Sequence, residues 1–304
     1  MPIKHVMVTG AHRSGTSYVG RVITKSRGYT YLTEPCNHQW GIEGINHFYP
    51  YPSDYYKNLM DDFFRGNFKY KQGVYENPVV NIFTKLVGNK LSMTGTYYKY
   101  FGKRYTRMLL KDPLGAYLSD YLHDRHDVSV LVLIRHPMAF SVSQKRMGWR
   151  TDFSQLLSQT DLIKSYLSEE REMMAGNLTY DEENGLIWRC LYKVLHDYNT
   201  KNRTSDRWLC VRHEDLCLDP LPCFEKIVRF LGLTMNDKMR RFIVKTTSGA
   251  TVQPENREYL HFARDSRRLA YSWKDRVTQK ETDVIRSITE DIARHYYDDD
   301  SWER

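Results

Sequence analysis

A short glycine-rich segment near the start of the chain carries residue types suited to binding an anion. An apolar run leads into it and a helical pattern follows it. Glycines permit a tight turn, and backbone N–H groups in such a turn can point at an oxyanion on the N-terminus of the next helix. Arg13 adds a positive charge inside the turn. We predict a phosphate-type site here, made of Gly10, Ala11, His12, Arg13, Ser14, Gly15, Thr16 and Ser17.

This segment differs from the loop of P-loop nucleotide kinases, which have Lys at the position of Thr16. P-loop NTPases also end a neighbouring strand with an Asp that holds Mg²⁺. Here the apolar run 128–134 ends at Arg135, a cation. We therefore expect a nucleotide with extra negative charge and no bound metal. Ser143, eight residues beyond Arg135 and within a helical pattern, would complete a clamp for a second phosphate.

The elements that must position these residues alternate along the chain. Apolar segments predict strands at 4–9, 29–33, 107–110, 128–134 and 207–211. Helical patterns separate several of them, at 17–26, 114–124, 184–201 and 221–231. Such alternation indicates a parallel sheet, and the unbroken apolar run 128–134 is typical of a strand covered on both faces. We predict an α/β, P-loop-like three-layer fold: a central parallel sheet of about five strands flanked by helices.

Composition limits the functional classes. The 304 residues are 41% hydrophobic, enough for a sizeable core, and 13% aromatic content excludes a disordered chain. The formal charge of +8 suits an anionic ligand but is too diffuse to indicate nucleic acid. The longest strongly apolar run, 128–134, is far shorter than the roughly 20 residues that a membrane helix needs.

The cysteines and the start of the chain predict the cellular compartment. The five cysteines are odd in number and contain no Cys-x-x-Cys spacing, which indicates reduced thiols rather than disulfides or a zinc site. The first strand begins almost at Met1, leaving no room for a signal peptide. We predict a cytoplasmic protein with no membrane or nucleic-acid partner. The oligomeric state stays open.

Two stretches interrupt the alternation of strands and helices. Residues 39–106 are rich in aromatic side chains, and residues 150–205 begin with a polar, helical stretch. We expect a single domain over 1–304 in which both stretches shape an acceptor pocket, because aromatic faces suit sugars and flat molecules. Packing within the core is the alternative interpretation of the aromatic side chains.

The glycine-rich segment and the Arg135–Ser143 pair together resemble the sulfotransferase family, which uses 3′-phosphoadenosine 5′-phosphosulfate (PAPS). In that family the loop binds the 5′-phosphosulfate, and the Arg and Ser bind the 3′-phosphate. Further matches follow in order: Glu34-Pro35, Lys111-Asp112-Pro113, His213-Glu214-Asp215-Leu216, Phe230-Leu231-Gly232-Leu233, Arg267-Arg268 and Ser272-Trp273-Lys274. The Arg-Ser-Gly form of the loop is similar to carbohydrate, protein-tyrosine and bacterial members. The cytosolic aryl type usually has Lys-Ser-Gly.

The resemblance implies roles for single residues. Glu34 corresponds to the catalytic base of the carbohydrate sulfotransferases, with His12 and His38 as reserve candidates. Arg13 and Lys111 would stabilise the negative charge that grows on the departing bridging oxygen. Residues expected at the adenine or the 3′-phosphate are His213, Arg267 and Arg268.

We predict an enzyme that moves the sulfuryl group from PAPS to a hydroxyl group, in line and without a metal. A sugar-like or polyhydroxylated small molecule, including a natural product, is the expected acceptor. The same chemistry on an amine or a protein tyrosine is an alternative. A P-loop small-molecule kinase is a further alternative, disfavoured by Thr16 and Arg135. A non-catalytic anion-binding module is another, and it leaves the combination of Arg13, Glu34 and Lys111 without an explanation.

Overall fold

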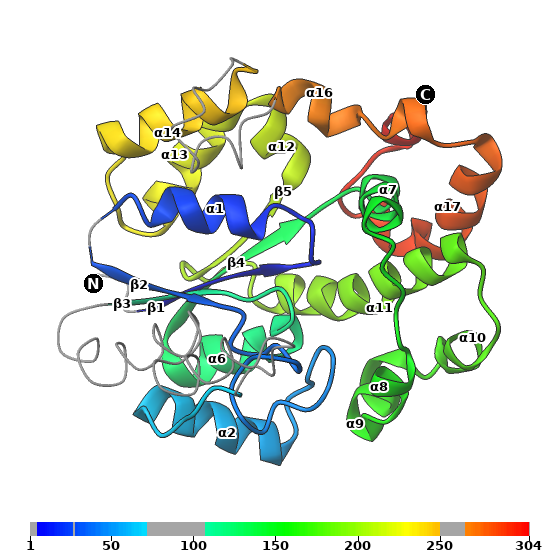
Figure 1. The fold of residues 1–304 in the computed structure, drawn as a ribbon, viewed down its shortest axis with the longest axis horizontal. Coiled ribbons are helices and arrows are strands. Elements are labelled where there is room, and N and C mark those ends of the chain that lie inside the picture. Colours follow the sequence, from blue (N-terminus) through cyan, green and yellow to red (C-terminus); the bar gives the residue numbers. More distant parts are fainter. Residues whose placement is uncertain (1–4, 27, 72–106, 250–264, 304) are drawn as a thin grey trace, which may run out of the picture.

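The computed structural model describes residues 5–26, 28–71, 107–249 and 265–303. It contains a five-stranded parallel sheet in the order β2-β3-β1-β4-β5 (Figure 1). The strands are β1 (His5–Gly10), β2 (Tyr29–Thr33), β3 (Arg107–Lys111), β4 (Val128–Ile134) and β5 (Trp208–Arg212). The predicted fold class is confirmed, and each predicted strand agrees to within one residue at either end.

Helices cover both faces of this sheet, as the apolar strands require. On one face, Val6 and Val8 of β1 pack in a core with residues of α1 (Thr16–Ile23), α13 (Pro220–Phe230) and α14 (Asp237–Thr247). On the other face, Met7 belongs to a core that includes α6 (Ser119–His126) and α11 (Tyr180–Lys201). Figure 1 shows these two helical layers above and below the strands. Every residue of β4, the strand between β1 and β5, is consequently buried.

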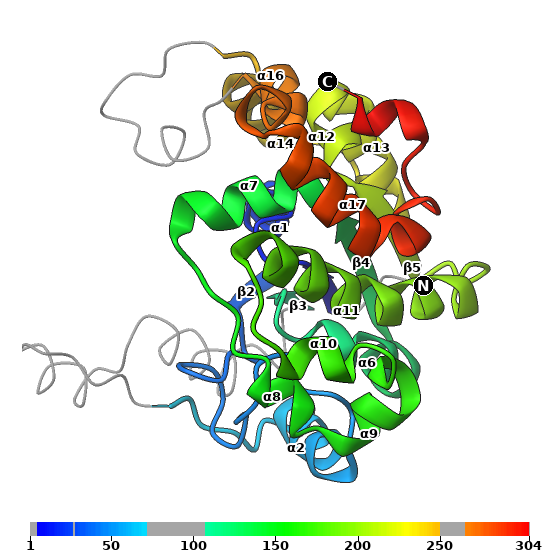
Figure 2. The same ribbon diagram turned by 90° about the vertical axis from the view of Figure 1, so that its right-hand side faces the viewer.

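The remaining described elements connect or flank this framework. The helices are α2 (Asp54–Arg65), α7 (Pro137–Met147), α8 (Ser154–Leu157), α9 (Thr160–Leu162), α10 (Arg171–Ala175), α12 (His213–Leu218), α16 (Ser266–Tyr271) and α17 (Gln279–Ala293). Single turns of other helix types span Ala116–Leu118, Ile163–Leu167, Lys274–Arg276 and Asp299–Trp302. In Figure 2, α17 lies against both α7 and α11.

Two helix boundaries differ from the sequence prediction for physical reasons. The pattern at 114–124 divides into a 3₁₀ turn followed by α6. Helix α11 begins at Tyr180 rather than at residue 184. Thr179 and Glu182 form a capping box, which satisfies the free N–H groups of a polar first turn that lacks an apolar pattern.

The two interrupting stretches show different structures. Within 39–106, residues 72–106 lie outside the described part, and residues 39–71 form a loop followed by α2. Rings in this described portion are buried at Tyr49, Tyr56 and Phe63, which favours the packing interpretation for those side chains. The stretch 150–205 is mainly helical, from α8 to α11. No helix in the described ranges is long and apolar enough to span a membrane.

Strands β1 and β4 approach closely where the glycine-rich loop begins. Gly10 has a φ of +121°, and a Cβ atom at this position would lie 2.0 Å from the backbone oxygen of Leu133. Gly148, at the end of α7, also has a positive φ of +64°, but a Cβ atom there would meet nothing within 4 Å. The two glycines therefore separate backbone strain from a steric clash.

We expect Gly10→Ala to lower the free energy of unfolding by about 3 kcal/mol or more, because clash and strain add. Gly148→Ala is the matched control and should cost about 1–2 kcal/mol, from the left-handed backbone alone. Urea denaturation followed by circular dichroism measures both losses. Equal losses would show that the close approach of β1 and β4 does not constrain the loop.

Candidate active site

The glycine-rich loop joins β1 to α1 and is fixed from within. Gly15 caps α1 with a φ of 95°, and Arg13 also has a left-handed φ of 68°. The Ser14 hydroxyl donates a hydrogen bond of 2.5 Å to the carbonyl oxygen of Ala11. Ser14 therefore stabilises the turn through its side chain, and the N-terminus of α1 is held in one orientation.

A cavity of about 330 Å³ lies at the N-terminus of α1. The loop and α1 line one side of it, α7 and α12 line others, and the end of α14 and residues 266–276 complete the wall. This cavity brings together seven of the predicted site residues, namely Arg13, Gly15, Thr16, Ser17, Arg135, Ser143 and His213. Parts of the chain far apart in sequence therefore converge on the predicted anion site.

The cavity has a strongly cationic lining. Arg13, Arg135, Arg146 and Arg276 line it, and no Asp or Glu does so among the described residues. The Nε atom of Arg13 donates to the Ser143 hydroxyl at 3.2 Å, which joins the loop to α7. Burial lowers the pKa of Arg13, and the nearby charge of Arg146 lowers it further. An anionic ligand with several charges would relieve this repulsion.

Arg135 is the most enclosed of these cations, with 9% of its surface exposed. Its Nη1 atom donates to the carbonyl oxygen of Arg13 at 2.7 Å, while its Nε atom is buried without a hydrogen-bond partner. Burial lowers the pKa of Arg135, and the charge of Glu214 opposes this shift. Glu214 itself accepts hydrogen bonds from the His136 N–H (3.0 Å) and the Tyr297 hydroxyl (2.8 Å). The arginine therefore retains unused capacity to bind an anion.

His213 covers the N-terminus of α1 from the opposite side of the cavity. A Cβ atom at position 15 would lie 3.1 Å from Cδ2 of His213, so the close packing of this ring requires Gly15. Burial lowers the pKa of His213 well below its usual value, which keeps the imidazole neutral. The Sγ atom of Cys217 lies 3.6 Å from its Nδ1 atom. A neutral ring at this position can contact a flat, uncharged group.

Four predicted site residues do not line the cavity: His12, Ser14, Arg267 and Arg268. Arg267 and Arg268 are exposed on α16, and Arg268 lies 3.5 Å from the carboxylate of Asp265. Their contact with the 3′-phosphate stays a prediction. Sequence reasoning missed two cavity residues, Arg146 and Arg276. The spacing of Arg146 from Ser143, three positions along one helix, could have identified it, whereas Arg276 carries no such signal.

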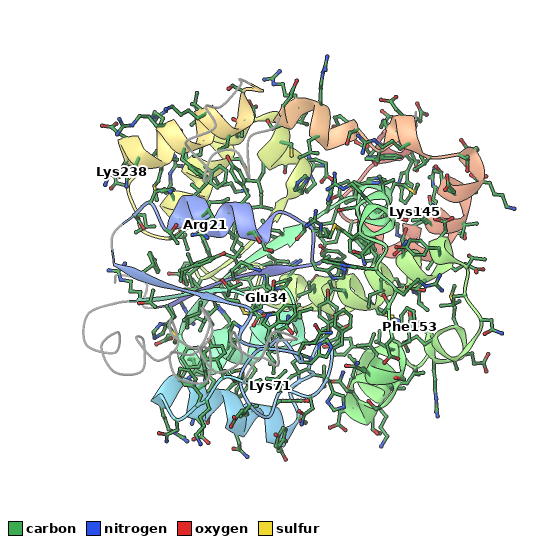
Figure 3. All side chains as sticks on the ribbon, in the orientation of Figure 1. Arg21, Glu34, Lys71, Lys145, Phe153 and Lys238 are labelled. Atoms are coloured by element: carbon green, nitrogen blue, oxygen red, sulfur yellow. The ribbon has the colours of Figure 1, made fainter. Side chains whose placement is uncertain are left out.

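Glu34 and Lys111 lie together where β2 and β3 end. Thr33 pairs with Lys111 in the sheet, and the Glu34 N–H donates to the Lys111 carbonyl oxygen at 2.8 Å. Their side chains form an ion pair through Oε1 of Glu34, while Asn37 donates to Oε2 at 2.9 Å. Figure 3 shows Glu34 near the middle of the molecule. The structure therefore places the predicted base and the predicted strand-end cation in direct contact.

Two features fix this pair in place. Glu34 has a left-handed φ of 50°, a conformation that costs energy in a non-glycine residue. Asp112, fully buried beside it in sequence from Lys111, accepts hydrogen bonds from the N–H groups of Cys36 (2.6 Å), Leu114 (3.1 Å) and Gly115 (3.0 Å). Burial raises the pKa of Asp112 to about 6. Asp112 thus ties the chain after β2 to the turn after β3.

His12 faces a group of aromatic rings rather than the cationic cavity. Its Nδ1 atom lies 2.8 Å from the Tyr49 hydroxyl, and its ring contacts Phe48, Phe140 and Trp149. Burial lowers the pKa of His12 to about 4, so the ring is neutral near pH 7. Because the charge of Glu34 acts on the pKa of His12 in the opposite direction, the two groups are electrostatic neighbours.

The site therefore has two parts at the carboxyl ends of the strands. One is a cationic cavity around the N-terminus of α1, suited to phosphate or sulfate groups. The other is the Glu34–Lys111 pair, which supplies a proton acceptor and a cation. Open α/β sheets place ligands at this edge.

Comparisons with known proteins agree with this arrangement. The family model described as "Sulfotransferase domain" matches residues 4–298. Mouse carbohydrate sulfotransferase 2 is 24% identical over 167 residues, which cover 50% of this chain and 31% of that protein. The match thus spans about a third of the length of that relative.

Solved structures show the same fold at low sequence identity. The sulfotransferase domain from the curacin biosynthetic pathway superposes with a TM-score of 0.52, 13% identity and 97% coverage of both chains. That of the Synechococcus PCC 7002 olefin synthase gives 0.51 and 17%, covering 98% of this chain and 96% of its own. Mouse sulfotransferase SULT7A1 complexed with PAP gives 0.51 and 12%, with coverages of 99% and 88%. With the family model matching nearly its whole length, the chain belongs to the PAPS-dependent sulfotransferase family.

Proposed function

We propose that this protein transfers the sulfuryl group of PAPS to a hydroxyl group of a sugar-like or polyhydroxylated acceptor. The observation that carries the proposal is the cavity at the N-terminus of α1, lined by four arginines and by no acidic residue of the described chain. PAPS has phosphate groups at its 3′ and 5′ positions and supplies an activated sulfuryl group. Its charge matches this cavity, which fits a polyanion.

On the donor side, the contacts divide the phosphate groups between two ends of the cavity. Arg135 and Ser143 are proposed to hold the 3′-phosphate. Thr16, Ser17 and the start of α1 are proposed to hold the 5′ group, because helix N-termini favour anions. Arg13 joins the two ends, since it contacts Ser143 through its side chain and Arg135 through its backbone. The bound nucleotide would then be fixed at both ends, which favours in-line geometry.

On the catalytic side, Glu34 and Lys111 are proposed to act in one exchange. Glu34 takes the proton of the acceptor hydroxyl as its oxygen bonds to sulfur and the bond from sulfur to the bridging oxygen breaks. Lys111 leaves Oε1 of Glu34 and neutralises the charge that the bridging oxygen gains. Asn37 keeps Oε2 of Glu34 in position during this exchange. The residues transfer charge and a proton, and the proposal requires no metal.

The nature of the acceptor rests on weaker support than the donor. One relative is named a carbohydrate sulfotransferase, and two structural neighbours belong to the curacin pathway and an olefin synthase. These names support sugar-like and natural-product acceptors respectively. Amines and protein tyrosines are the alternatives that an acceptor screen would distinguish. The kinase alternative loses support, because the family match is to sulfotransferases and Arg135 lines the cavity at the end of β4.

The donor assignment is tested by calorimetric titration with 3′-phosphoadenosine 5′-phosphate (PAP), with and without Mg²⁺. We expect tight binding that does not change with Mg²⁺, and weaker binding of AMP because it lacks the 3′-phosphate. ATP serves as the second control. Stronger binding of ATP that required Mg²⁺ would overturn the proposed function.

We predict that Arg135→Ala weakens PAP binding by about 100-fold or more, because a buried charge–phosphate contact is lost. AMP binding should change much less, since AMP has no 3′-phosphate. Ser143→Ala removes a neutral partner and should weaken PAP binding by about tenfold. Arg125→Ala is the matched control, because its side chain is 60% exposed on α6 and does not line the cavity. Unchanged PAP affinity in both cavity variants would rule out the 3′-phosphate assignment.

We predict that Glu34→Gln lowers kcat by about 10²–10⁴-fold, the range of general-base catalysis, and leaves the Kd of PAP unchanged. Initial rates of sulfation, measured with an acceptor from the screen, give kcat, and calorimetry gives Kd. The control Glu43→Gln changes an exposed carboxylate in the same connecting loop. A kcat within threefold of the wild-type value would show that another group, with His12 the first candidate, removes the proton.

A further inference from the structure

A series of aromatic rings runs along one side of the active site, outside the cationic cavity. The ring centroids of Trp149 and His12 lie 5.8 Å apart, those of His12 and Phe48 lie 6.2 Å apart, and those of Phe48 and His38 lie 5.7 Å apart. We name these four residues the aromatic wall. Its members come from three segments: the glycine-rich loop, the chain after Glu34 and the chain after α7.

The aromatic wall adjoins both the donor loop and the proposed base. His12 directly precedes Arg13, which lines the donor cavity. His38 follows Glu34 by four residues, and the charge of Glu34 acts on the pKa of His12. An acceptor that places a hydroxyl group at Glu34 would therefore meet these rings with the rest of its structure.

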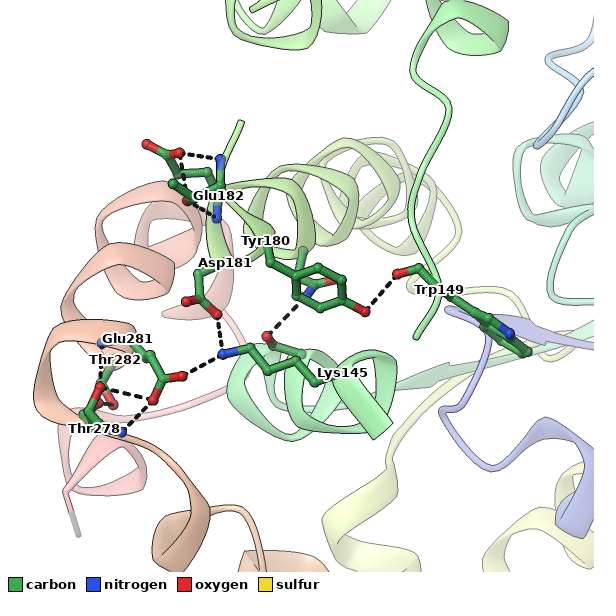
Figure 4. Close-up of polar contacts among 11 residues, drawn as sticks. Lys145, Trp149, Tyr180, Asp181, Glu182, Thr278, Glu281 and Thr282 are labelled. Carbon is green, nitrogen blue, oxygen red and sulfur yellow. Dashed lines mark hydrogen bonds and ion pairs between the residues drawn. The ribbon is translucent and has the colours of Figure 1, made fainter. Parts of the chain in front are cut away.

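Trp149 is the exposed member of the wall, with 43% of its surface accessible to solvent. Its backbone is nevertheless held firmly, because the Tyr180 hydroxyl donates to the Trp149 carbonyl oxygen at 2.7 Å (Figure 4). The next residue, Arg150, pairs with Glu183 at 2.6 Å. An exposed indole on a fixed backbone can bind a ligand at little cost in conformational entropy.

An ion-pair network holds the helix before Trp149. Lys145 on α7 contacts Asp181 at the start of α11 (2.6 Å) and Glu281 at the start of α17 (2.5 Å), as Figure 4 shows. Glu281 also completes the capping box of α17, and its hydrogen bonds, with Lys145 first among them, lower its pKa to about 2. The end of α7 is therefore fixed to two other helices, and the position of Trp149 follows from it.

The opposite end of the wall offers a polar atom. The Nδ1 atom of His38 is buried and has no hydrogen-bond partner, while its ring meets Phe48 edge to face. Asn37, next to His38, already holds the Glu34 carboxylate. Flat rings that alternate with polar groups suit a pyranose, which has apolar C–H faces and hydroxyl groups around its edge. A plain aromatic acceptor would leave the His38 nitrogen unpaired.

We propose that Trp149 is the specificity residue for the acceptor, stacking on the face of a pyranose whose hydroxyl group is sulfated at Glu34. His38 receives or donates a hydrogen bond at the edge of the same sugar. This inference rests on the proposed function and deepens it, because it identifies the chemical class of the acceptor and the residue that selects it.

The test uses the full-length protein with PAPS and two acceptors, methyl β-D-glucopyranoside and methyl N-acetyl-β-D-glucosaminide. We expect Trp149→Ala to raise the KM of a pyranoside by about tenfold and to leave kcat unchanged, because stacking is equal in the ground and transition states. Trp149→Phe should keep most of the affinity. The matched control, Tyr55→Ala, removes another exposed ring, on α2. 4-Nitrophenol serves as a flat acceptor for comparison.

Binding gives a second readout that does not depend on turnover. Saturation-transfer NMR on the PAP-saturated protein should show contact between the pyranoside and the wild-type protein, and this contact should be lost in Trp149→Ala. Pyranosides that do not bind the wild type, or that bind Trp149→Ala equally well, would overturn this inference. If 4-nitrophenol lost as much as the pyranosides, the sugar class would be wrong. The proposed function fails separately, if PAP itself does not bind.

Discussion

The chemistry of this protein depends on the register of its parallel sheet. Lys111 pairs with Val8 of β1 and with Thr33 of β2, so β3 and β2 end together beside the start of the glycine-rich loop. Gly10, the last residue of β1, pairs with Leu133 near the end of β4. A shift of one residue in any of these pairings would turn a functional side chain to the other face of the sheet. Register, rather than any single contact, aligns the site.

This alignment collects positive charges that the folded chain compensates only in part. Arg135 is supported by its bond to the Arg13 carbonyl oxygen and by Trp188, which donates to the Arg135 carbonyl oxygen at 2.8 Å. Neither contact supplies a negative charge, and the cavity has no acidic lining in the described ranges. The arrangement is costly without a ligand, since buried cations without partners destabilise a fold. It is consistent with selection for anion binding over stability.

The sequence was enough to predict the sheet and the donor loop, because both have local signals. Unbroken apolar runs marked the strands, and glycine spacing with Arg13 marked the loop. The left-handed backbone of Glu34 and the ion pair with Lys111 could not be predicted, since they depend on where two strands end in space. The exposure of Arg267 and the inward position of Arg276 escaped prediction for a similar reason. Both positions depend on how residues 265–276 pack against distant helices.

His12 and Arg13 show how one loop can serve two substrates. They are adjacent, yet Arg13 lines the donor cavity while His12 joins the aromatic rings and Tyr49. The left-handed φ of Arg13 turns the chain between them, so their side chains face different sides of the same loop. In the proposed reaction, the sulfuryl group would cross this short distance toward Glu34. Donor and acceptor are thus kept in separate environments, cationic and aromatic, which meet only where transfer must occur.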